Sequence, residues 1–412
     1  MKQTEVGLIP DDWEVKKLET IALTASGGTP LRSNKSFYTG NVRWFTTSEL
    51  KDCFLNDSNE HISQEAVFSS SAKIFPKQTL LMAMYGATIG RLGILNYSAA
   101  TNQACCAIIP EHDDVLYLYY YLLHNRESIV AMGCGAGQPN ISQEIIKNLL
   151  ISLPPLEEQQ RIAKSLSDVD ALIFTTEKLL QKKRNIKQGA MQNLRTGKKR
   201  LPGFAKSNNT KMTELGEIPE DWEVKTLNEF IDDFIVPMRD KPTDLTGPIP
   251  WCRIEDFDGK YLSESKTNQG VSLETIKKMN LKIFPLNTLL VSCSANLGKC
   301  AIVSKELITN QTFIGLVPNK TVNVEYLFYK MSFEESRLNE MATGTTISYL
   351  SREQFEKYEI TTPPTKEEQS AIAKVLSSMD KEIETLNTKL EKYRNLKTAM
   401  MQQLLTGKIR LG

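Results

Sequence analysis

The stretches that come closest to a catalytic motif occur at matching places in the two halves of the chain. Pro10-Asp11 precedes Glu14-Val15-Lys16, and Pro219-Glu220 precedes Glu223-Val224-Lys225; these are the letters of a metal-dependent nuclease motif. In such a nuclease the acidic residues converge on one metal ion from separate backbone positions, and a gap of two residues makes this convergence difficult. The repetition in both halves instead favours a structural role for these stretches.

Other signatures of catalysis are missing from the sequence. A Walker phosphate loop requires G-x-x-x-x-G-K-[ST], and the nearest stretches, which begin at Gly197 and Gly298, lack the first glycine and the hydroxyl. The dinucleotide-binding fingerprint G-x-G-x-x-G is also absent. The nearest stretch contains Gly133, Gly135 and Gly137, and it does not follow a convincing strand. An adenine methyltransferase would be expected to show Asn or Asp before Pro-Pro and an aromatic residue, and the chain has no such run. We therefore expect no catalytic residue.

The cysteines and histidines do not indicate a metal site. The chain has seven cysteines without a C-x-x-C pair, and its three histidines, His61, His112 and His124, all lie in the first half. A zinc site needs several such ligands at close spacing, and the two halves cannot share a histidine-based site. We predict no metal ligand and no cofactor bound by this chain.

The composition is that of a globular protein outside the membrane. Of the 412 residues, 41% are hydrophobic and 24% are charged, and no apolar run approaches the roughly 20 residues of a membrane-spanning helix. The N-terminal residues are acidic where a secretory signal would be apolar, so we expect a cytoplasmic location and no membrane partner. Segments 1–155 and 207–365 are mildly acidic, whereas 156–206 and 366–412 are basic. A protein that coats nucleic acid by bulk electrostatics would need a strongly basic domain.

A repeated opening sequence divides the chain in two. GLIPDDWEVKKL begins at Gly7 and GEIPEDWEVKTL at Gly216, and nine of the twelve letters agree. The similarity continues through KIFP, T-N-Q, Pro-Pro before E-E-Q, and T-G-K-x-R-L at a nearly constant offset, which indicates a tandem duplication of two whole domains. Trp13 and Trp222 are predicted to fill the core of each domain; stacking on a ligand is the alternative.

Each copy is predicted to combine a mixed α/β domain with one long helix. Runs such as VRWFTT, TLLMAMY and ACCAIIP are rich in β-branched, aromatic and aliphatic residues and are bounded by Gly, Pro and Asn, as strands are. VLYLYYYLLHN is typical of a helix on which the tyrosines pack. The predicted class is α+β, with domains at 1–155 and 207–365, a spacer helix and linker at 156–206, and a C-terminal spacer helix at 366–412.

The predicted long helices carry an apolar stripe with the alternating spacing of a coiled coil. Its predicted members are Ile162, Leu166, Val169, Ile173 and Leu180 in the first helix and Ile372, Leu376, Met379, Ile383, Leu386 and Leu390 in the second. We predict that the two helices bury these stripes against each other in antiparallel pairing. The alternative is that each helix packs only on its own domain.

The order of these motifs resembles the DNA-specificity (S) subunits of type I restriction-modification systems over essentially the whole chain. The resemblance rests on G-x-I-P-x-D-W at the start of each copy, Gly27-Gly28-Thr29-Pro30 before the Trp44 strand, Thr101-Asn102-Gln103 with Thr309-Asn310-Gln311, and E-E-Q-x-x-I-A-K at each helix start. In one departure, Gly-Gly-Thr-Pro has no clean counterpart in the second copy, which reads Ile235-Val236-Pro237-Met238-Arg239. The two recognition loops should therefore differ in shape.

The resemblance implies two target-recognition domains, each of which reads one half of a bipartite double-stranded DNA sequence, and a pair of helices that acts as the spacer between them. It also implies two methyltransferase (M) subunits that dock on this frame and use S-adenosylmethionine. Two restriction (R) subunits that use ATP and Mg would complete the nuclease. The S subunit itself would be non-catalytic.

Candidate DNA contacts are the positions that differ between otherwise matched segments, because positions alike in both copies must serve the shared scaffold. With Trp44 aligned to Trp251, the segment 46–48 lies opposite 253–255. Arginine can bond guanine twice, and Ser or Thr can bond several bases. The predicted contacts are Arg32, Lys35, Arg43, Thr46, Thr47, Ser48, Arg91, Gln138, Asn140, Arg239, Lys241, Arg253, Lys299, Thr345, Thr346 and Tyr349. The alternative for each is a solvated surface residue.

Two other function classes stay open at this point. One is a stand-alone two-domain DNA-binding regulator, and the other is a structural adaptor whose duplicated domains bind protein. Methyltransferase and translocase genes beside this one would favour the specificity subunit over both.

Overall fold

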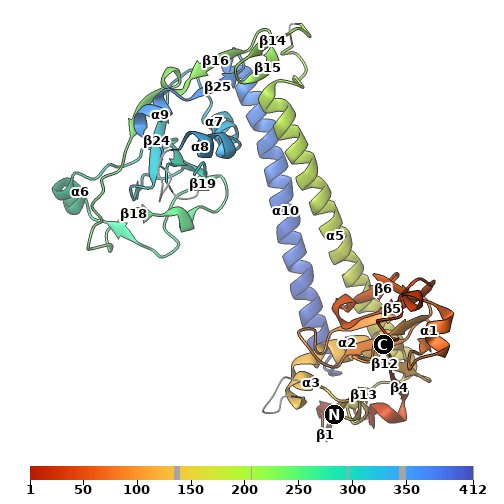
Figure 1. Cartoon of the computed structure of the whole chain (residues 1–412). Coiled ribbons are helices and arrows are strands. Elements are labelled where there is room, and N and C mark those ends of the chain that lie inside the picture. Colours follow the sequence, from red (N-terminus) through yellow and green to blue (C-terminus); the bar gives the residue numbers. More distant parts are fainter. Residues whose placement is uncertain (134–139, 206, 295–296, 343–348, 412) are drawn as a thin grey trace. The chain divides into compact units, whose positions relative to one another are not determined.

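The computed structural model contains two compact units (Figure 1). Residues 1–178 with 388–412 form unit 1, and residues 179–387 form unit 2. Each unit therefore holds the mixed α/β part of one copy of the sequence repeat, and both long helices contribute to both units. The structure describes all residues except 134–139, 206, 295–296, 343–348 and 412.

Unit 1 is built on two sheets, with strand orders β4-β12-β9-β10-β6 and β7-β5-β11-β8. β9 and β10 are buried along their whole length, as expected for apolar strands that are covered on both faces. The strands are β4 (Ala22–Ser26), β5 (Val42–Phe45), β6 (Cys53–Leu55), β7 (Glu60–Ile62), β8 (Ile74–Phe75), β9 (Leu80–Ala83), β10 (Leu92–Leu95), β11 (Ala99–Thr101) and β12 (Cys105–Pro110).

Unit 2 repeats this arrangement, with strand orders β17-β24-β21-β22-β19 and β20-β18-β23. Strands of matching sequence hold matching places in both units, which confirms the predicted duplication of a mixed α/β domain. The strands are β17 (Ile231–Ile235), β18 (Ile249–Cys252), β19 (Tyr261–Leu262), β20 (Gly270–Val271), β21 (Leu289–Ser292), β22 (Cys300–Val303), β23 (Ile308–Thr309) and β24 (Phe313–Pro318).

Short elements complete each unit. The remaining strands form antiparallel pairs: β1 (Lys2–Thr4) with β2 (Gly7–Ile9), β3 (Glu14–Lys17) with β13 (Leu150–Leu153), β14 (Thr210–Thr213) with β15 (Gly216–Pro219), and β16 (Glu223–Thr226) with β25 (Glu359–Thr362). The short α-helices are α1 (Gln64–Phe68), α2 (Val115–His124), α3 (Arg126–Met132), α4 (Gln143–Lys147), α6 (Leu273–Met279), α7 (Val324–Met331), α8 (Glu335–Met341) and α9 (Arg352–Glu356). A capping box of Ser351 with Gln354 starts α9.

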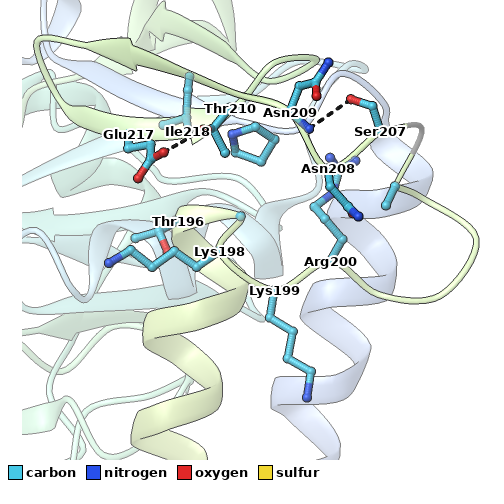
Figure 2. A pocket seen from close by; sticks show the side chains of 13 residues that line it. Thr196, Lys198, Lys199, Arg200, Ser207, Asn208, Asn209, Thr210, Glu217 and Ile218 are labelled. Carbon is cyan, nitrogen blue, oxygen red and sulfur yellow. Dashed lines mark hydrogen bonds between the residues drawn. The ribbon is translucent and has the colours of Figure 1, made fainter.

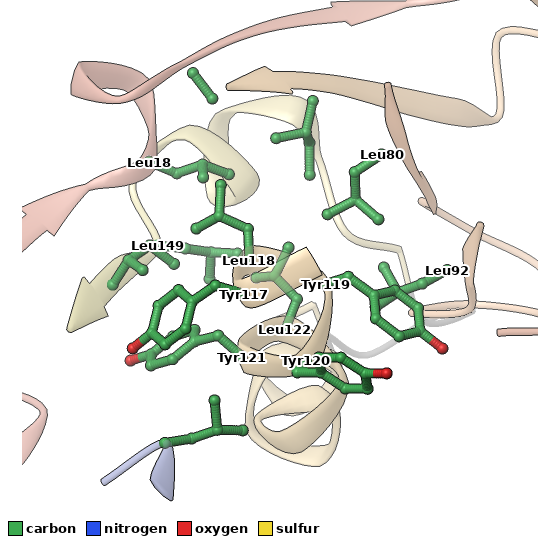
Figure 3. Close-up of a cluster of buried hydrophobic side chains, with 14 of the residues drawn as sticks. Leu18, Leu80, Leu92, Tyr117, Leu118, Tyr119, Tyr120, Tyr121, Leu122 and Leu149 are labelled. Atoms are coloured by element: carbon green, nitrogen blue, oxygen red, sulfur yellow. The ribbon is translucent and has the colours of Figure 1, made fainter. Parts of the chain in front are cut away.

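The tyrosines of α2 are part of the core of unit 1 (Figure 3). Their rings are buried, and each hydroxyl group donates a hydrogen bond: Tyr117 to Ser152, Tyr119 to Asp52, Tyr120 to Asp170 and Tyr121 to Leu150. A buried tyrosine needs such a partner for its hydroxyl group. The prediction that these tyrosines pack is confirmed.

The long helices α5 (Leu156–Thr196) and α10 (Lys366–Leu404) lie side by side (Figure 1). In unit 1, Asp170 pairs with Lys397 at 2.6 Å and Glu177 with Arg394 at 2.7 Å. As the residue numbers of these pairs rise along α5, those of their partners on α10 fall, so the two helices are antiparallel. In unit 2 the residues after Leu179 continue this direction, since Lys183 pairs with Glu382 at 2.6 Å.

The predicted apolar stripe lies on the inner faces of these helices. Its residues near the helix ends also join the domain cores: Ile162 and Leu166 belong to the core of unit 1 that contains Trp13. The helices thus pair with each other and also pack on their own domains. Ile162, Leu166, Val169, Leu180, Ile372, Leu376 and Leu390 are buried, while Ile173, Met379, Ile383 and Leu386 are half-buried.

Two lysines interrupt the stripe in equivalent places, and each meets an aspartate and a tyrosine. In unit 1, Asp170 binds both Lys397 and the hydroxyl group of Tyr120. In unit 2, Asp380 binds Lys187 and, at 2.5 Å, the hydroxyl group of Tyr329. A polar contact inside an apolar stripe fixes register because any shift leaves it unpaired.

The repeated opening sequence builds a tryptophan socket in each unit. In unit 1 this socket consists of Asp12, Trp13 and Glu158, and Arg410 from the C-terminal segment binds both carboxylates at 2.6 to 2.8 Å. Trp13 is fully buried and donates to Glu158 at 3.2 Å.

The socket of unit 2 consists of Asp221, Trp222 and Glu368 and is filled by Arg200 in the same way, with its four contacts between 2.6 and 3.2 Å. The prediction that Trp13 and Trp222 fill the cores is confirmed. The repeated T-G-K-x-R-L segments supply the arginines that bind the two sockets.

Candidate nucleic-acid interface

The loops of unit 1 with the predicted DNA contacts gather at one edge of the five-stranded sheet, which we call the loop edge. β4 ends there at Ser26 and antiparallel β12 begins there, since Cys106 pairs with Ser26. β9 ends at the same edge, because Cys105 pairs with Ala83. Arg91 lies just before β10 and its carbonyl oxygen accepts a hydrogen bond from Ala83.

The Gly-Gly-Thr-Pro loop lies against the T-N-Q segment at this edge. A Cβ atom on Gly27 would collide with Thr101, and the amide of Gly28 donates to the carbonyl oxygen of Thr101 at 2.8 Å. Only glycine permits such a close backbone approach. The side chain of Thr29 donates a hydrogen bond to Gln103, so the loop presents hydroxyl and amide groups together.

The segment after β5 reaches the same loop edge. β5 and β11 are parallel, and the amide of Asn102 donates to the carbonyl oxygen of Phe45 at 3.0 Å. Thr46 follows Phe45 and begins the 3₁₀ helix Thr47–Glu49, whose Glu49 carboxylate accepts from the amide of Thr46 at 2.8 Å. The predicted Thr46, Thr47 and Ser48 therefore lie beside Asn102.

The predicted arginines of unit 1 are all engaged by carboxylates. Arg32 binds Glu60 with two hydrogen bonds of 2.8 Å and lies over the rings of Tyr38 and Trp44. Arg43 pairs with Asp57 at 3.3 Å, and Arg91 with Asp52 at 2.5 Å. Lys35 is exposed on the 3₁₀ helix Lys35–Tyr38, and Asn140 is exposed and bridges to Tyr85 at the loop edge.

Unit 2 has the equivalent loop edge with different side chains. Arg253 directly follows β18, which is parallel to β23, and Lys299 lies before β22, where its carbonyl oxygen accepts from Ser292 at 2.8 Å. Tyr349 bridges to Ser294 after β21 and is exposed. Arg239, in the loop after β17, is close enough to lower the pKa of Tyr349, against the larger effect of burial, which raises it.

The loops after β4 and β17 differ, as predicted from the missing Gly-Gly-Thr-Pro. In unit 1 this loop leads into the 3₁₀ helix Lys35–Tyr38, whereas the corresponding stretch of unit 2, 236–248, contains no helix. Lys241 is exposed on this stretch. The predicted Gln138, Thr345 and Thr346 lie outside the described residues.

Two residues at or near the loop edges were not among the predicted contacts. Gln103 was part of the quoted T-N-Q repeat, so the repeat signals its place in the scaffold, but only the structure shows its bond to Thr29. Gln269 accepts a hydrogen bond of 2.9 Å from Arg253. Nothing in the sequence marks Gln269, because 16 residues separate it from Arg253 and it precedes a different strand.

The two stretches that resemble a metal-dependent nuclease motif in sequence do not form a metal site in the structure. Glu14 pairs with Lys16 at 2.7 Å on β3, and Glu223 pairs with Lys225 at 2.8 Å on β16, so each lysine neutralises the carboxylate beside it. In the described part of the chain no three His, Cys, Asp or Glu side chains come together in a way that could hold a metal ion. No helix of the described residues is long and apolar enough to cross a membrane.

The cavity in Figure 2 lies in unit 2 beside the turn after α5 and the strands β14 and β15. Its volume is about 440 Å³, and Thr210 donates to Glu217 at 2.6 Å along its wall. Lys198, Lys199 and Asn208 also line it. The Thr210–Glu217 contact joins exposed side chains of the paired strands β14 and β15.

The fold and the two loop edges define a protein with duplicated recognition domains on one helical frame. A family model for the type I restriction modification DNA specificity domain matches residues 10–188 and 219–392. The chain belongs to this family, with one match for each copy of the repeat.

Relatives and solved structures of the same kind cover nearly the whole chain. The MjaVIII specificity subunit of a type I restriction enzyme from Methanocaldococcus jannaschii is 27% identical over 421 residues, which cover 98% of this chain and 94% of that protein. The MjaIX specificity subunit from the same organism is 26% identical over 426 residues, 100% of this chain and 96% of that protein. The crystal structure of a type I S subunit from M. genitalium has the same fold, with a TM-score of 0.62, 15% identity and 98% coverage of both chains.

Proposed function

We propose that this chain is the non-catalytic DNA sequence-specificity subunit of a type I restriction-modification complex. Each domain reads one half of a bipartite double-stranded DNA target, and the antiparallel helices α5 and α10 set the spacing of the two halves. The observation that carries this proposal is the pair of loop edges. The scaffold is the same in both units, but Thr46 in one stands where the other has Arg253.

A protein that recognises a bipartite DNA sequence needs two matched scaffolds that carry different polar side chains. Backbone positions held in the same place present different donors and acceptors to a base edge, and the base pairs of the major groove differ in their donors and acceptors. A symmetric protein-binding adaptor would have no reason to vary these positions while it keeps the strands around them. A stand-alone regulator remains the second reading of the same geometry.

Exposed apolar surface on α5 supports the docking of protein partners. In unit 1, Leu172 and Phe174 are exposed on α5, and Phe174 lines a groove of about 480 Å³ together with exposed Phe54. In unit 2, Leu179 and Ile186 are exposed. Phe54 and Phe174 bring exposed apolar surface together in one groove, and such patches mark interaction surfaces. We assign them to two methyltransferase subunits, with two restriction subunits in the complete complex.

The chemistry belongs to those partners in this proposal. The methyltransferase subunits would use S-adenosylmethionine, and the restriction subunits would use ATP and Mg. The specificity subunit would bind no cofactor and would supply only the choice of sequence. Because its reading domains are mildly acidic, the partners would also provide much of the phosphate contact that holds DNA.

The test is to co-express the full chain with the methyltransferase encoded beside it and to map methylated adenines across the genome of the host. We expect a split, asymmetric motif that is absent without this chain. Methylation that is independent of the chain, or no new methylation, would contradict the proposal. Regulated transcription without any methylation would instead support the stand-alone regulator.

A further inference from the structure

Arg253 occupies a fixed place at the loop edge of unit 2. It follows β18 directly and precedes the 3₁₀ helix Ile254–Asp256. Its amide donates to the carboxylate of Asp256 at 2.6 Å, as the amide of Thr46 donates to Glu49 in unit 1. The backbone is thus anchored in the same way in both units, and the two side chains start from equivalent positions.

The side chain of Arg253 is held by an amide group. Its Nη2 donates to Oε1 of Gln269 at 2.9 Å, and the residue is half-buried. Gln269 is itself fixed, because its carbonyl oxygen accepts from the amide of Trp251 at 2.9 Å. A guanidinium group has five N–H donors, so this bond orients it and leaves four donors without a partner among the residues that the structure describes.

Arg253 differs from the arginines of unit 1 in its charge balance. Arg32, Arg43 and Arg91 each pair with a carboxylate. No carboxylate of the described residues forms an ion pair with the Arg253 side chain. Asp256, three residues further along, is buried, and its two oxygens accept from the amides of Arg253 and Lys266 at 2.6 and 2.8 Å.

A rigid guanidinium group with free donors and no counter-charge fits one kind of base. Guanine presents two acceptors, N7 and O6, to the major groove, and arginine bonds both at once. An amide anchor keeps the positive charge available, whereas a carboxylate would neutralise it. Orientation before binding also lowers the cost of immobilising a long side chain.

We propose that Arg253, positioned by Gln269, reads a guanine in the half-site recognised by unit 2. This inference rests on the proposed function and adds a residue and a base to it. Unit 1 has Thr46 at the equivalent position and therefore reads its half-site without this contact. Gln269 is a positioning residue, since it acts on DNA through Arg253.

The experiment measures binding of the complex of this chain with its methyltransferase to duplexes in which one base pair at a time is replaced across the mapped motif. For the unmodified chain, we expect replacement of one G·C pair in the unit 2 half-site to weaken binding about 5- to 150-fold, the range of a bidentate contact. Arg253→Thr, which installs the residue of unit 1, should abolish that discrimination at this base pair alone. Gln269→Leu should reduce the discrimination without abolishing it.

Matched controls separate a lost contact from a lost fold. Lys357→Ala removes an exposed cation of unit 2 that pairs with Glu353 of α9, and it should leave the whole binding profile unchanged. In Arg253→Thr, the penalties for replacements at the other base pairs of the unit 2 half-site should stay as they were, which shows that unit 2 of the variant is folded. Arg253→Lys keeps the charge and should still lose the bidentate discrimination.

Two results would overturn the inference while the proposed function stands. One is a unit 2 half-site made only of A·T pairs. The other is an Arg253→Thr complex that discriminates every base pair as the unmodified complex does. If the unmodified chain directs no split methylation motif at all, the proposed function fails first and the inference fails with it.

Discussion

Replacement of Arg200 by methionine should destabilise unit 2 strongly, because it leaves a buried carboxylate without its partner. The Arg200 side chain is 9% exposed and that of Glu368 is 2% exposed. Arg200 donates to both oxygens of Glu368, to Asp221 and to the carbonyl oxygen of Phe204. Methionine fills a similar volume but satisfies none of these acceptors.

The size of the effect follows from this burial. Breaking a buried ion pair by removal of one partner costs about 3–5 kcal/mol in free energy of unfolding. For a unit of about 200 residues, each kcal/mol corresponds to about 2–4 °C in Tm. We therefore expect the unfolding transition of unit 2 to fall by about 6–20 °C. The double variant Arg200→Met with Glu368→Met should recover most of this loss, because it removes the stranded charge.

The effect should also depend on pH. Burial already raises the pKa of Glu368 above its usual value, although Arg200 beside it acts to lower it, and loss of Arg200 raises the pKa further. A carboxyl group whose pKa is higher in the folded state favours folding when it is protonated. Stability of Arg200→Met should thus be greatest below pH about 4.5, near the unfolded pKa, and fall as pH rises through the folded pKa.

Differential scanning calorimetry of the full chain at several pH values measures both effects. Arg352→Met is the matched control, because Arg352 pairs with Glu356 on the surface, where such pairs contribute about 0–1 kcal/mol. A loss below 1 kcal/mol for Arg200→Met, or a double variant as unstable as the single one, would refute the role given to this socket.

Three further predictions concern the frame and its charge. Gly197→Ala should lower Tm, because Gly197 has φ +73° and a Cβ atom there would collide with Pro219. Gly189→Ala should instead stabilise the protein by about 0.5–1 kcal/mol, because Gly189 lies inside α5 and a Cβ atom there would meet nothing within 4 Å. Thermal melts that rank the two variants the other way would contradict this geometry. Lys183→Glu should weaken the helix pair, and Glu382→Lys should restore it with a coupling of about 0.2–1 kcal/mol; no coupling in a double-mutant cycle would speak against the antiparallel register. The isolated chain should bind DNA weakly with a shallow salt dependence, so tight site-specific binding between 50 and 200 mM salt would disprove the role given to the partners.

The duplication and the helix pairing could be predicted because both leave local signals. The repeat is visible letter by letter, and the apolar stripe reports a helix that must bury one face. Trp13 and Trp222 were correctly predicted as core residues for the same reason, since a large apolar ring after a turn needs a covered site.

The tryptophan sockets were beyond sequence reasoning, although their parts were visible. Arg410 reaches Asp12 across 398 residues of chain, and Arg200 reaches Glu368 across 168. The repeated arginine was a usable signal, but only the path of the chain shows that the C-terminal segment returns to the first domain. Long-range ion pairs of this kind depend on tertiary folding.

The sequence gives no basis for ranking the DNA candidates, for the same physical reason. Arg32 and Arg253 look alike in a sequence, but Glu60 neutralises the first and Gln269 orients the second. Neither partner is adjacent in the chain. The predicted DNA contacts thus remain predictions, with the described ones now placed by unit and by the partners that hold them.

The most direct test of the account is to exchange residues 207–365 for the corresponding domain of another family member and to map methylated adenines with the same methyltransferase. We predict that one half of the bipartite motif changes, while the other half and the spacing stay the same. A motif that changes in both halves, or one that does not change, would contradict the claim that each domain reads its own half-site.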